Sequence, residues 1–179
     1  MIRPALALTA VGIAALVVQG ALAALLPPAL VPDLGLLVTV IAAVEAPALL
    51  ALALAAGLGY GTDYLSGTLL GEAALLRIVT FAGTRFVSAQ FHLERPLPLA
   101  GLCLAVALLE PLGTAALSSL FAGASPFGWD ALPTLATRAV LAAALAPFVH
   151  AVVSGALLGL SEGEARRREV RFETRRPVL

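Results

Sequence analysis

The sequence has 179 residues, of which 60% are apolar and only 12% are charged. A soluble domain is about half apolar and about one quarter charged, so a globule of this size could not keep so much apolar surface from water. The formal net charge is zero and Cys103 is the only cysteine, which excludes a basic nucleic-acid-binding protein and an internal disulfide. The composition predicts an all-α, polytopic membrane protein.

Uncharged stretches separated by turn residues predict a bundle of six transmembrane helices. A helix needs about 20 residues at 1.5 Å each to cross a bilayer. We place the spans at residues 4–26, 30–44, 47–65, 72–91, 98–121 and 132–160. Residues 1–160 then form a single transmembrane domain, and residues 161–179 form a basic tail.

The positions of the arginines predict the orientation. The tail from Ser161 onward holds six of the eleven arginines, Arg3 precedes the first span, and Arg95 lies between the fourth and fifth. The positive-inside rule places all three regions in the cytoplasm, so both termini are expected there. The first apolar stretch, with Ala21-Leu22-Ala23 near its end, also resembles a signal peptide. It is longer than the usual core of about 7–15 residues, which favours a retained helix.

Two pairs of glycines are spaced four residues apart in the predicted helices. Gly57 and Gly61 lie in the third span, and Gly155 and Gly159 lie in the sixth. Small residues at this spacing allow close approach of a second helix, and we expect contacts within the bundle rather than a homodimer face. The segment is not a dinucleotide-binding loop, because Thr62 stands where the third glycine would be and no strand precedes it.

A series of polar and small residues links the second span to the fourth. Pro32-Asp33 opens the second span, and the later series reads Gly59, Asp63, Ser66, Gly67, Gly71 and Leu75. Together these residues resemble the rod shape-determining protein MreD family. The resemblance covers residues 32–75, and beyond them only size and layout agree. The chain departs from the family pattern at Leu69, where members often carry proline, and at Ala73, where they carry a polar ring.

The resemblance implies a non-catalytic scaffold subunit of the bacterial cell-elongation machinery, with no cofactor. Members of the family sit in the inner membrane, in contact with lipid, and associate with MreC. They help to couple the MreB filament to the RodA glycosyltransferase and its penicillin-binding transpeptidase, which make peptidoglycan. We therefore expect this chain in a bacterial inner membrane, with MreC as its partner.

Four ionisable residues within the predicted spans are expected at a similar depth. From the cytoplasmic ends, Asp63, Arg77 and Glu110 lie about 24, 21 and 18 Å deep, and Arg138 comes to about 21 Å. Charges inside a bilayer normally face protein or water. We therefore predict a neutral polar cluster of these four residues that sets helix register, with a gate or a binding site for a partner helix as the sharper hypothesis.

The remaining polar residues do not form a catalytic or metal-binding motif in the sequence. His92 and His150 have no nearby cysteine or acid at metal-ligand spacing, which favours packed or interfacial side chains. Ser118, Ser119 and Ser154 lack a nearby His–Asp arrangement in sequence, so an intramembrane enzyme is a remote alternative.

A transport subunit is the main alternative. The substrate-binding components of energy-coupling-factor transporters for vitamins also have about six spans. They use small residues in the first helix, where Ala10 and Ala14 offer the same spacing. In an alanine-rich helix this match carries little weight.

Overall fold

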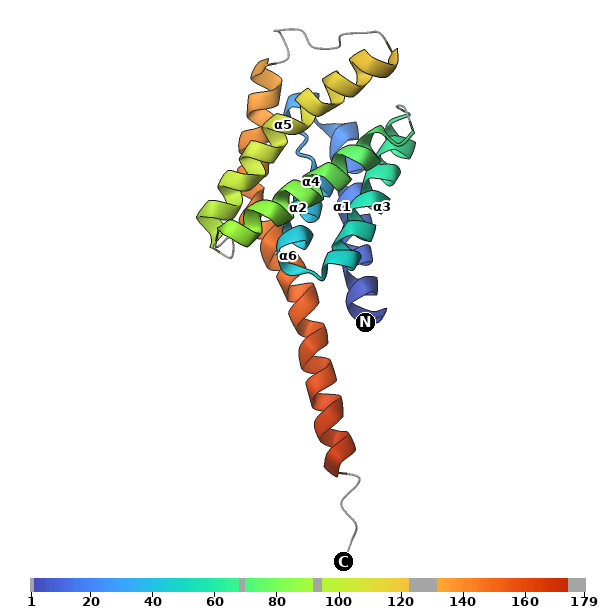
Figure 1. Ribbon diagram of the computed structural model, residues 1–179, viewed down its shortest axis with the longest axis vertical. Helices are drawn as coiled ribbons and strands as arrows, with labels where there is room; N and C mark the ends of the chain where they lie inside the picture. Colours follow the sequence, from blue (N-terminus) through green and yellow to red (C-terminus); the bar gives the residue numbers. More distant parts are fainter. Residues whose placement is uncertain (1, 68–69, 92–94, 123–131, 174–179) are drawn as a thin grey trace, which may run out of the picture.

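The computed structural model describes the backbone of residues 2–67, 70–91, 95–122 and 132–173. Side-chain surroundings are described for residues 3–67, 70–91, 95–120 and 132–158. The elements are α1 (Ile2–Leu25), the short 3-10 helix η1 (Pro28–Leu30), α2 (Leu34–Glu45), α3 (Ala48–Ser66), α4 (Glu72–Gln90), α5 (Pro96–Ala122) and α6 (Leu132–Glu173). Figure 1 shows them as one helical bundle from which the end of α6 projects. The all-α prediction is confirmed, since the described part of the chain has no strand.

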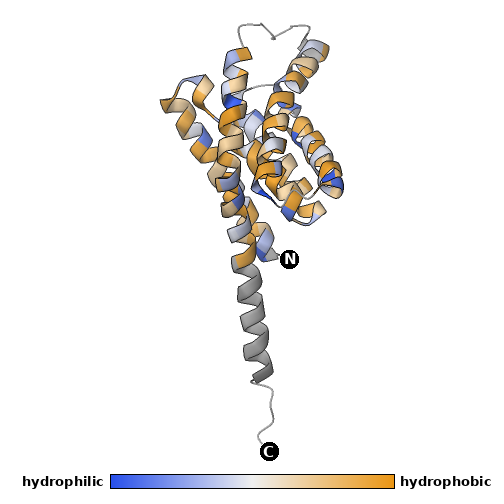
Figure 2. Ribbon diagram, turned by 90° about the vertical axis from the view of Figure 1, so that its left-hand side faces the viewer, coloured by the Kyte–Doolittle hydropathy of each residue, from blue (hydrophilic) through white to orange (hydrophobic). Residues whose placement is uncertain are grey.

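In the described part of the chain, five segments are long and apolar enough to cross a bilayer: α1, η1 with α2, α3, α5 and α6. Figure 2 shows apolar residues along most of the length of the helices that it colours, as expected for helices surrounded by lipid. The chain is therefore a multi-pass membrane protein. The fourth predicted span, α4, is 19 residues long but carries Glu72, Arg77 and Arg85, and it is not among the five.

Helix α2 forms the centre of the bundle and contacts every other α-helix. It has 12 residues, and nine of them, from Gly35 to Ala43, are buried. A helix that is apolar on all sides is expected to be covered by other helices. The observed helix begins later than the second predicted span. Pro32 and Asp33 delay the start of the helix to Leu34.

Both ends of α2 are completed by polar side chains. At its start, the carboxylate of Asp33 accepts the backbone N–H three residues ahead, and Gln19 of α1 accepts the N–H of Gly35 at 3.2 Å. At its end, Arg85 of α4 donates to the carbonyl of Ala43 at 2.7 Å. A buried helix has no water for its free backbone groups, and an acid at the N-terminus with a cation at the C-terminus also complements the helix dipole.

Helices α3 and α4 approach each other most closely at Gly59. A Cβ atom there would lie 2.7 Å from both the carbonyl oxygen of Ala73 and the amide nitrogen of Ala74, so only glycine fits. The connection between the helices also depends on glycine. Gly67 and Gly71 have positive φ angles of 67° and 98°, a conformation that other residues rarely adopt.

The glycine pairs singled out in the sequence behave differently. Gly57 and Gly155 are exposed, and a Cβ atom added to either would have no neighbour within 4 Å among the described residues, so the internal packing predicted for them is not made there. A Cβ atom added to Gly61 would lie 3.0 Å from a side-chain carbon of Leu16 on α1, so this glycine does face a neighbouring helix. Gly159 lies outside the residues whose surroundings are described. The close face of α3 is that of Gly59, which is rotated about 200° from Gly57.

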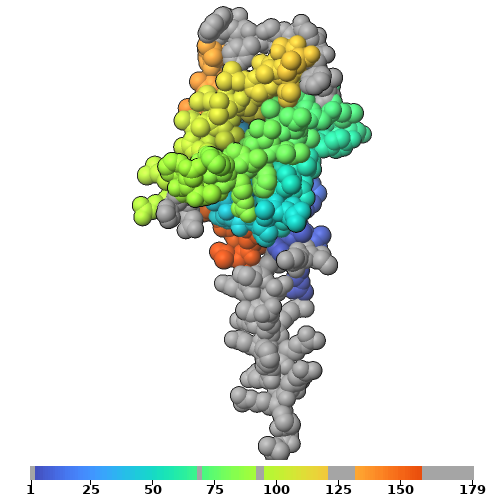
Figure 3. Space-filling view, viewed as in Figure 1, coloured from blue at the N-terminus to red at the C-terminus, as the bar shows by residue number. Residues whose placement is uncertain are grey.

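The other helices pack around α2, and their directions define two halves of the bundle. Helices α5 and α6 form an extensive antiparallel pair, and α4 lies across the molecule between α3 and α5 (Figure 3). The start of α1 and the end of α6 point to the same end of the bundle (Figure 1). The start of α2, the end of α3 and the starts of α4 and α6 consequently lie in the other half.

Candidate functional site

A buried arginine joins three helices in the half of the bundle away from the termini. The side chain of Arg77 on α4 is 1% exposed. Its Nη2 atom lies 2.6 Å from Oδ2 of Asp33, at the start of α2, and 3.5 Å from Oε1 of Glu110 on α5. A charged side chain at the centre of a spanning helix costs about 2.5–3.5 kcal/mol on insertion scales, so such groups are stable only with partners. The arginine therefore ties α2, α4 and α5 together.

Asp33 has two roles, and each of its two carboxylate oxygen atoms serves one of them. Oδ1 accepts the backbone N–H of Leu36 at 2.8 Å, and Oδ2 binds Arg77 at 2.6 Å. The sequence pattern places Asp33 in the family-like motif but not in the predicted polar cluster. Aspartate commonly caps the N-terminus of a helix, and Asp33 directly precedes an apolar helix. This position was the signal in the sequence that Asp33 belongs with the buried helix ends.

Asp63 is fully buried near the end of α3 and binds backbone groups rather than a cation. Its two oxygen atoms accept the N–H groups of Gly71, Ala73 and Ala74 at 2.9, 2.9 and 3.3 Å. These are free N–H groups at the start of α4, whose N-cap residue is a glycine without a side chain. The carboxylate of Asp63 therefore caps the following helix and fixes the turn between the two.

Arg138, on the second turn of α6, donates from Nε to the carbonyl of Val31 at 3.0 Å. This bond joins α6 to the segment that connects η1 to α2. Among the described residues, Arg138 makes no ion pair with Glu110. The four residues of the predicted cluster line the same pocket. Of these four, only Arg77 and Glu110 are within ion-pair distance of each other.

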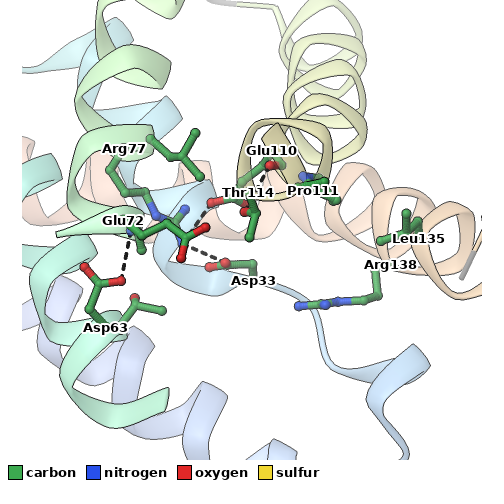
Figure 4. Close-up of a pocket in the computed structure, with 13 residues that line it drawn as sticks. Asp33, Asp63, Glu72, Arg77, Glu110, Pro111, Thr114, Leu135 and Arg138 are labelled. Carbon is green, nitrogen blue, oxygen red and sulfur yellow. Dashed lines mark hydrogen bonds and ion pairs between the residues drawn. The ribbon is translucent and has the colours of Figure 1, made fainter. Parts of the chain in front are cut away.

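The space between these residues is a pocket of about 350 Å³ between α2, α3, α4, α5 and α6. We call it the charged pocket. Its charged lining residues are Asp33, Asp63, Glu72, Arg77, Glu110 and Arg138. Figure 4 shows their side chains reaching it from different helices. Glu72 was not anticipated as a site residue; it is the first residue of α4, and its Oε1 atom accepts a hydrogen bond from Ser118 of α5 at 3.0 Å.

A second polar cluster lies at the other end of α2. Nε2 of His150 on α6 is 2.5 Å from Oε1 of Glu45, and the hydroxyl of Ser154 lies 2.8 and 2.9 Å from the two oxygen atoms of Glu45. The serine hydroxyl also lies 2.7 Å from the carbonyl of its own helix at His150. In a nucleophilic serine the hydroxyl donates to the imidazole, so this cluster serves helix packing. His92 lies outside the described residues.

The charged pocket can therefore bind or position polar groups between the helices that line it. In the described part of the chain no three histidine, cysteine or acidic side chains gather as a metal site would require. In comparisons with known proteins, no family model, no curated protein and no solved structure matches the chain.

Proposed function

We propose that the chain is a non-catalytic scaffold subunit of a bacterial inner membrane, acting in the cell-elongation machinery as members of the MreD family do. One observation carries this proposal. The residues that resemble the family motif converge on the α2–α3–α4 unit, and most of them have a task there that depends on the residue type.

The tasks are distinct. Asp33 caps α2 and binds Arg77, Gly59 allows the backbone of α4 to approach α3, and Asp63 caps α4. Gly67 and Gly71 take the positive φ angles of the connecting turn. A chance match to a motif would have no reason to fall on residues that cooperate in one structural unit, so the convergence supports the resemblance.

The proposal includes six spans with both termini in the cytoplasm. The charges that lower the hydropathy of α4 have partners inside the bundle: Arg77 binds Asp33, and Arg85 donates to the end of α2. Because both arginines have partners inside the bundle, their charges are compatible with a membrane-spanning α4, which would be the sixth span. An even number of spans places the arginine-rich tail and Arg3 on one side, as the positive-inside rule requires.

The scaffold would act by recognition rather than by chemistry. It would hold MreC in the membrane and link the MreB filament to RodA and its transpeptidase. A rigid bundle suits this role, because α2 is held at both ends by side chains of neighbouring helices. The partner surface would then stay in a fixed orientation.

The test is depletion of the chain in its own host, combined with recovery of MreC on the tagged protein. We expect rounded cells after depletion and MreC in the purified complex. The Gly57→Ala variant should restore rod shape, whereas Gly59→Leu should not, because its side chain would push α4 away from α3. Rod-shaped growth after depletion, without recovery of MreC, would refute the proposal.

One observation favours the second candidate, a vitamin-binding subunit of an energy-coupling-factor transporter. Such a protein needs a pocket toward the outside, and the charged pocket lies in the half of the bundle away from both chain ends. Thermal stabilisation of the purified protein by one member of a vitamin panel would support this role. No shift with any vitamin, together with recovery of MreC, would favour the scaffold.

A further inference from the structure

The charged pocket contains more negative than positive groups. Four of its lining residues are acids and two are arginines, which leaves an excess of two negative charges when all are ionised. The N-terminus of α4, which binds Asp63, supplies only about half a positive charge. At least one carboxylate therefore has no cation to balance it. An unpaired charge in a low-dielectric interior is strongly unfavourable, and either a proton on one carboxylate or one further positive group in the pocket removes it.

Arg77 adds a second and independent requirement. Its buried Nε and Nη1 atoms have no hydrogen-bond partner among the described residues, and the residue is one of those that line the pocket. Buried N–H groups in proteins almost always have an acceptor. A cation alone would accept from neither of these donors. An oxygen atom in the pocket would accept from one of them, because Nε–H and Nη1–H lie on different edges of the guanidinium group.

The two requirements describe one kind of ligand. We propose that the charged pocket is a binding site for a small group that carries an ammonium ion next to an oxygen acceptor, as an ethanolamine unit does. The ammonium ion lies with Glu110 and Glu72, on adjacent helices, and the oxygen atom accepts from Arg77. This assignment is independent of the scaffold role, because it concerns only the chemistry of the pocket.

The size of the pocket agrees with this assignment. Its volume of about 350 Å³ exceeds the share of a single water molecule, about 30 Å³ in the liquid, by roughly tenfold. An ethanolamine unit and several water molecules fit within it. The same chemical group can come from two sources, a free amino alcohol in solution or the headgroup of phosphatidylethanolamine in the bilayer.

Cysteine labelling measures both access to the pocket and its charge preference. The starting protein is the full chain with Cys103→Ala, which removes the only native thiol. Thr114→Cys places a thiol in the pocket lining, and Ser119→Cys places one on an exposed position of the same helix. Each is treated with the cationic aminoethyl and the anionic sulfonatoethyl methanethiosulfonate reagents, which are similar in size.

We expect the cationic reagent to label Thr114→Cys at least tenfold faster than the anionic reagent, after division by the same ratio at Ser119→Cys. Glu110→Gln or Glu72→Gln should each reduce this preference several-fold, whereas Glu45→Gln, which alters the other polar cluster, should leave it unchanged. A ratio near one, or no reaction of Thr114→Cys with either reagent, would overturn the proposal. Ala115→Cys, also in the lining, replaces Thr114→Cys if that variant does not fold.

Protection from labelling identifies the ligand chemistry and its source. In detergent, millimolar ethanolamine should slow labelling of Thr114→Cys several-fold, whereas ethylene glycol, which has no ammonium group, should not. In nanodiscs without added ligand, phosphatidylethanolamine should protect and phosphatidylglycerol should not if the lipid is the source. Protection in either arm supports the site, and the arm in which it occurs names the source. Absence of protection in both arms, or equal protection by ethylene glycol, would overturn it.

Discussion

Replacement of Gly59 by alanine tests the closest helix contact in the bundle. The added methyl group would lie 2.7 Å from the carbonyl oxygen of Ala73 and from the amide nitrogen of Ala74, whereas ordinary van der Waals contact begins at 3.4 Å. The obstructing atoms belong to the backbone and cannot rotate away. Helix α4 must therefore move by several tenths of an ångström at its first turn.

The movement also affects the cap of α4, because Ala73 and Ala74 donate their N–H groups to Asp63. Overpacking a buried contact costs about 1–3 kcal/mol, and each weakened hydrogen bond costs about 0.5–1.5 kcal/mol. Alanine gains about 0.5–1 kcal/mol over glycine in a helix. We expect Gly59→Ala to lower the free energy of unfolding by about 1–5 kcal/mol in total.

The assay is titration with dodecyl sulfate in mixed micelles, followed by circular dichroism. Gly57→Ala is the matched control, since it adds the same methyl group to the same helix with no atom within 4 Å. It should be neutral or more stable by up to about 1 kcal/mol. If the two variants unfold at the same dodecyl sulfate concentration, the close approach at Gly59 does not exist in the folded protein.

Three further substitutions test the polar contacts. Arg77→Met should destabilise the bundle by about 3–5 kcal/mol, because it leaves the carboxylate of Asp33 buried without a cation; the double variant with Asp33→Asn should recover part of this loss in the same titration. Asp63→Ala should cost about 1–3 kcal/mol and speed hydrogen exchange in the first turn of α4, with Asp63→Asn intermediate. Ser154→Ala should lower the melting temperature modestly, by the equivalent of about 0.5–1.5 kcal/mol, because Glu45 loses a hydrogen-bond donor.

Each of these predictions has an outcome that contradicts it. No recovery in the double variant would mean that Arg77 stabilises the bundle other than by pairing with Asp33. Unchanged exchange in α4 after Asp63→Ala would mean that this carboxylate does not cap the helix. A Ser154→Ala variant as stable as the parent protein would show that the serine does not bind the carboxylate.

Composition and spacing were sufficient to predict the helical membrane fold. A chain that is 60% apolar has few alternatives, because lipid forces every backbone N–H and carbonyl group to pair within a helix. Prolines, glycines and charges then mark where helices end. The sequence also indicated that Arg77 and Glu110 lie at a similar depth, since the rise per residue of a helix is constant.

Only the tertiary structure decided which residues meet. Asp33 and Arg77 are 44 residues apart in the chain, and Glu45 pairs with a histidine more than 100 residues away. Helical periodicity groups residues on one face of one helix, but it does not say how each helix is rotated or which helix lies beside it. That rotation brought Gly59 rather than Gly57 against α4, and directed Asp63 to backbone N–H groups rather than to an arginine.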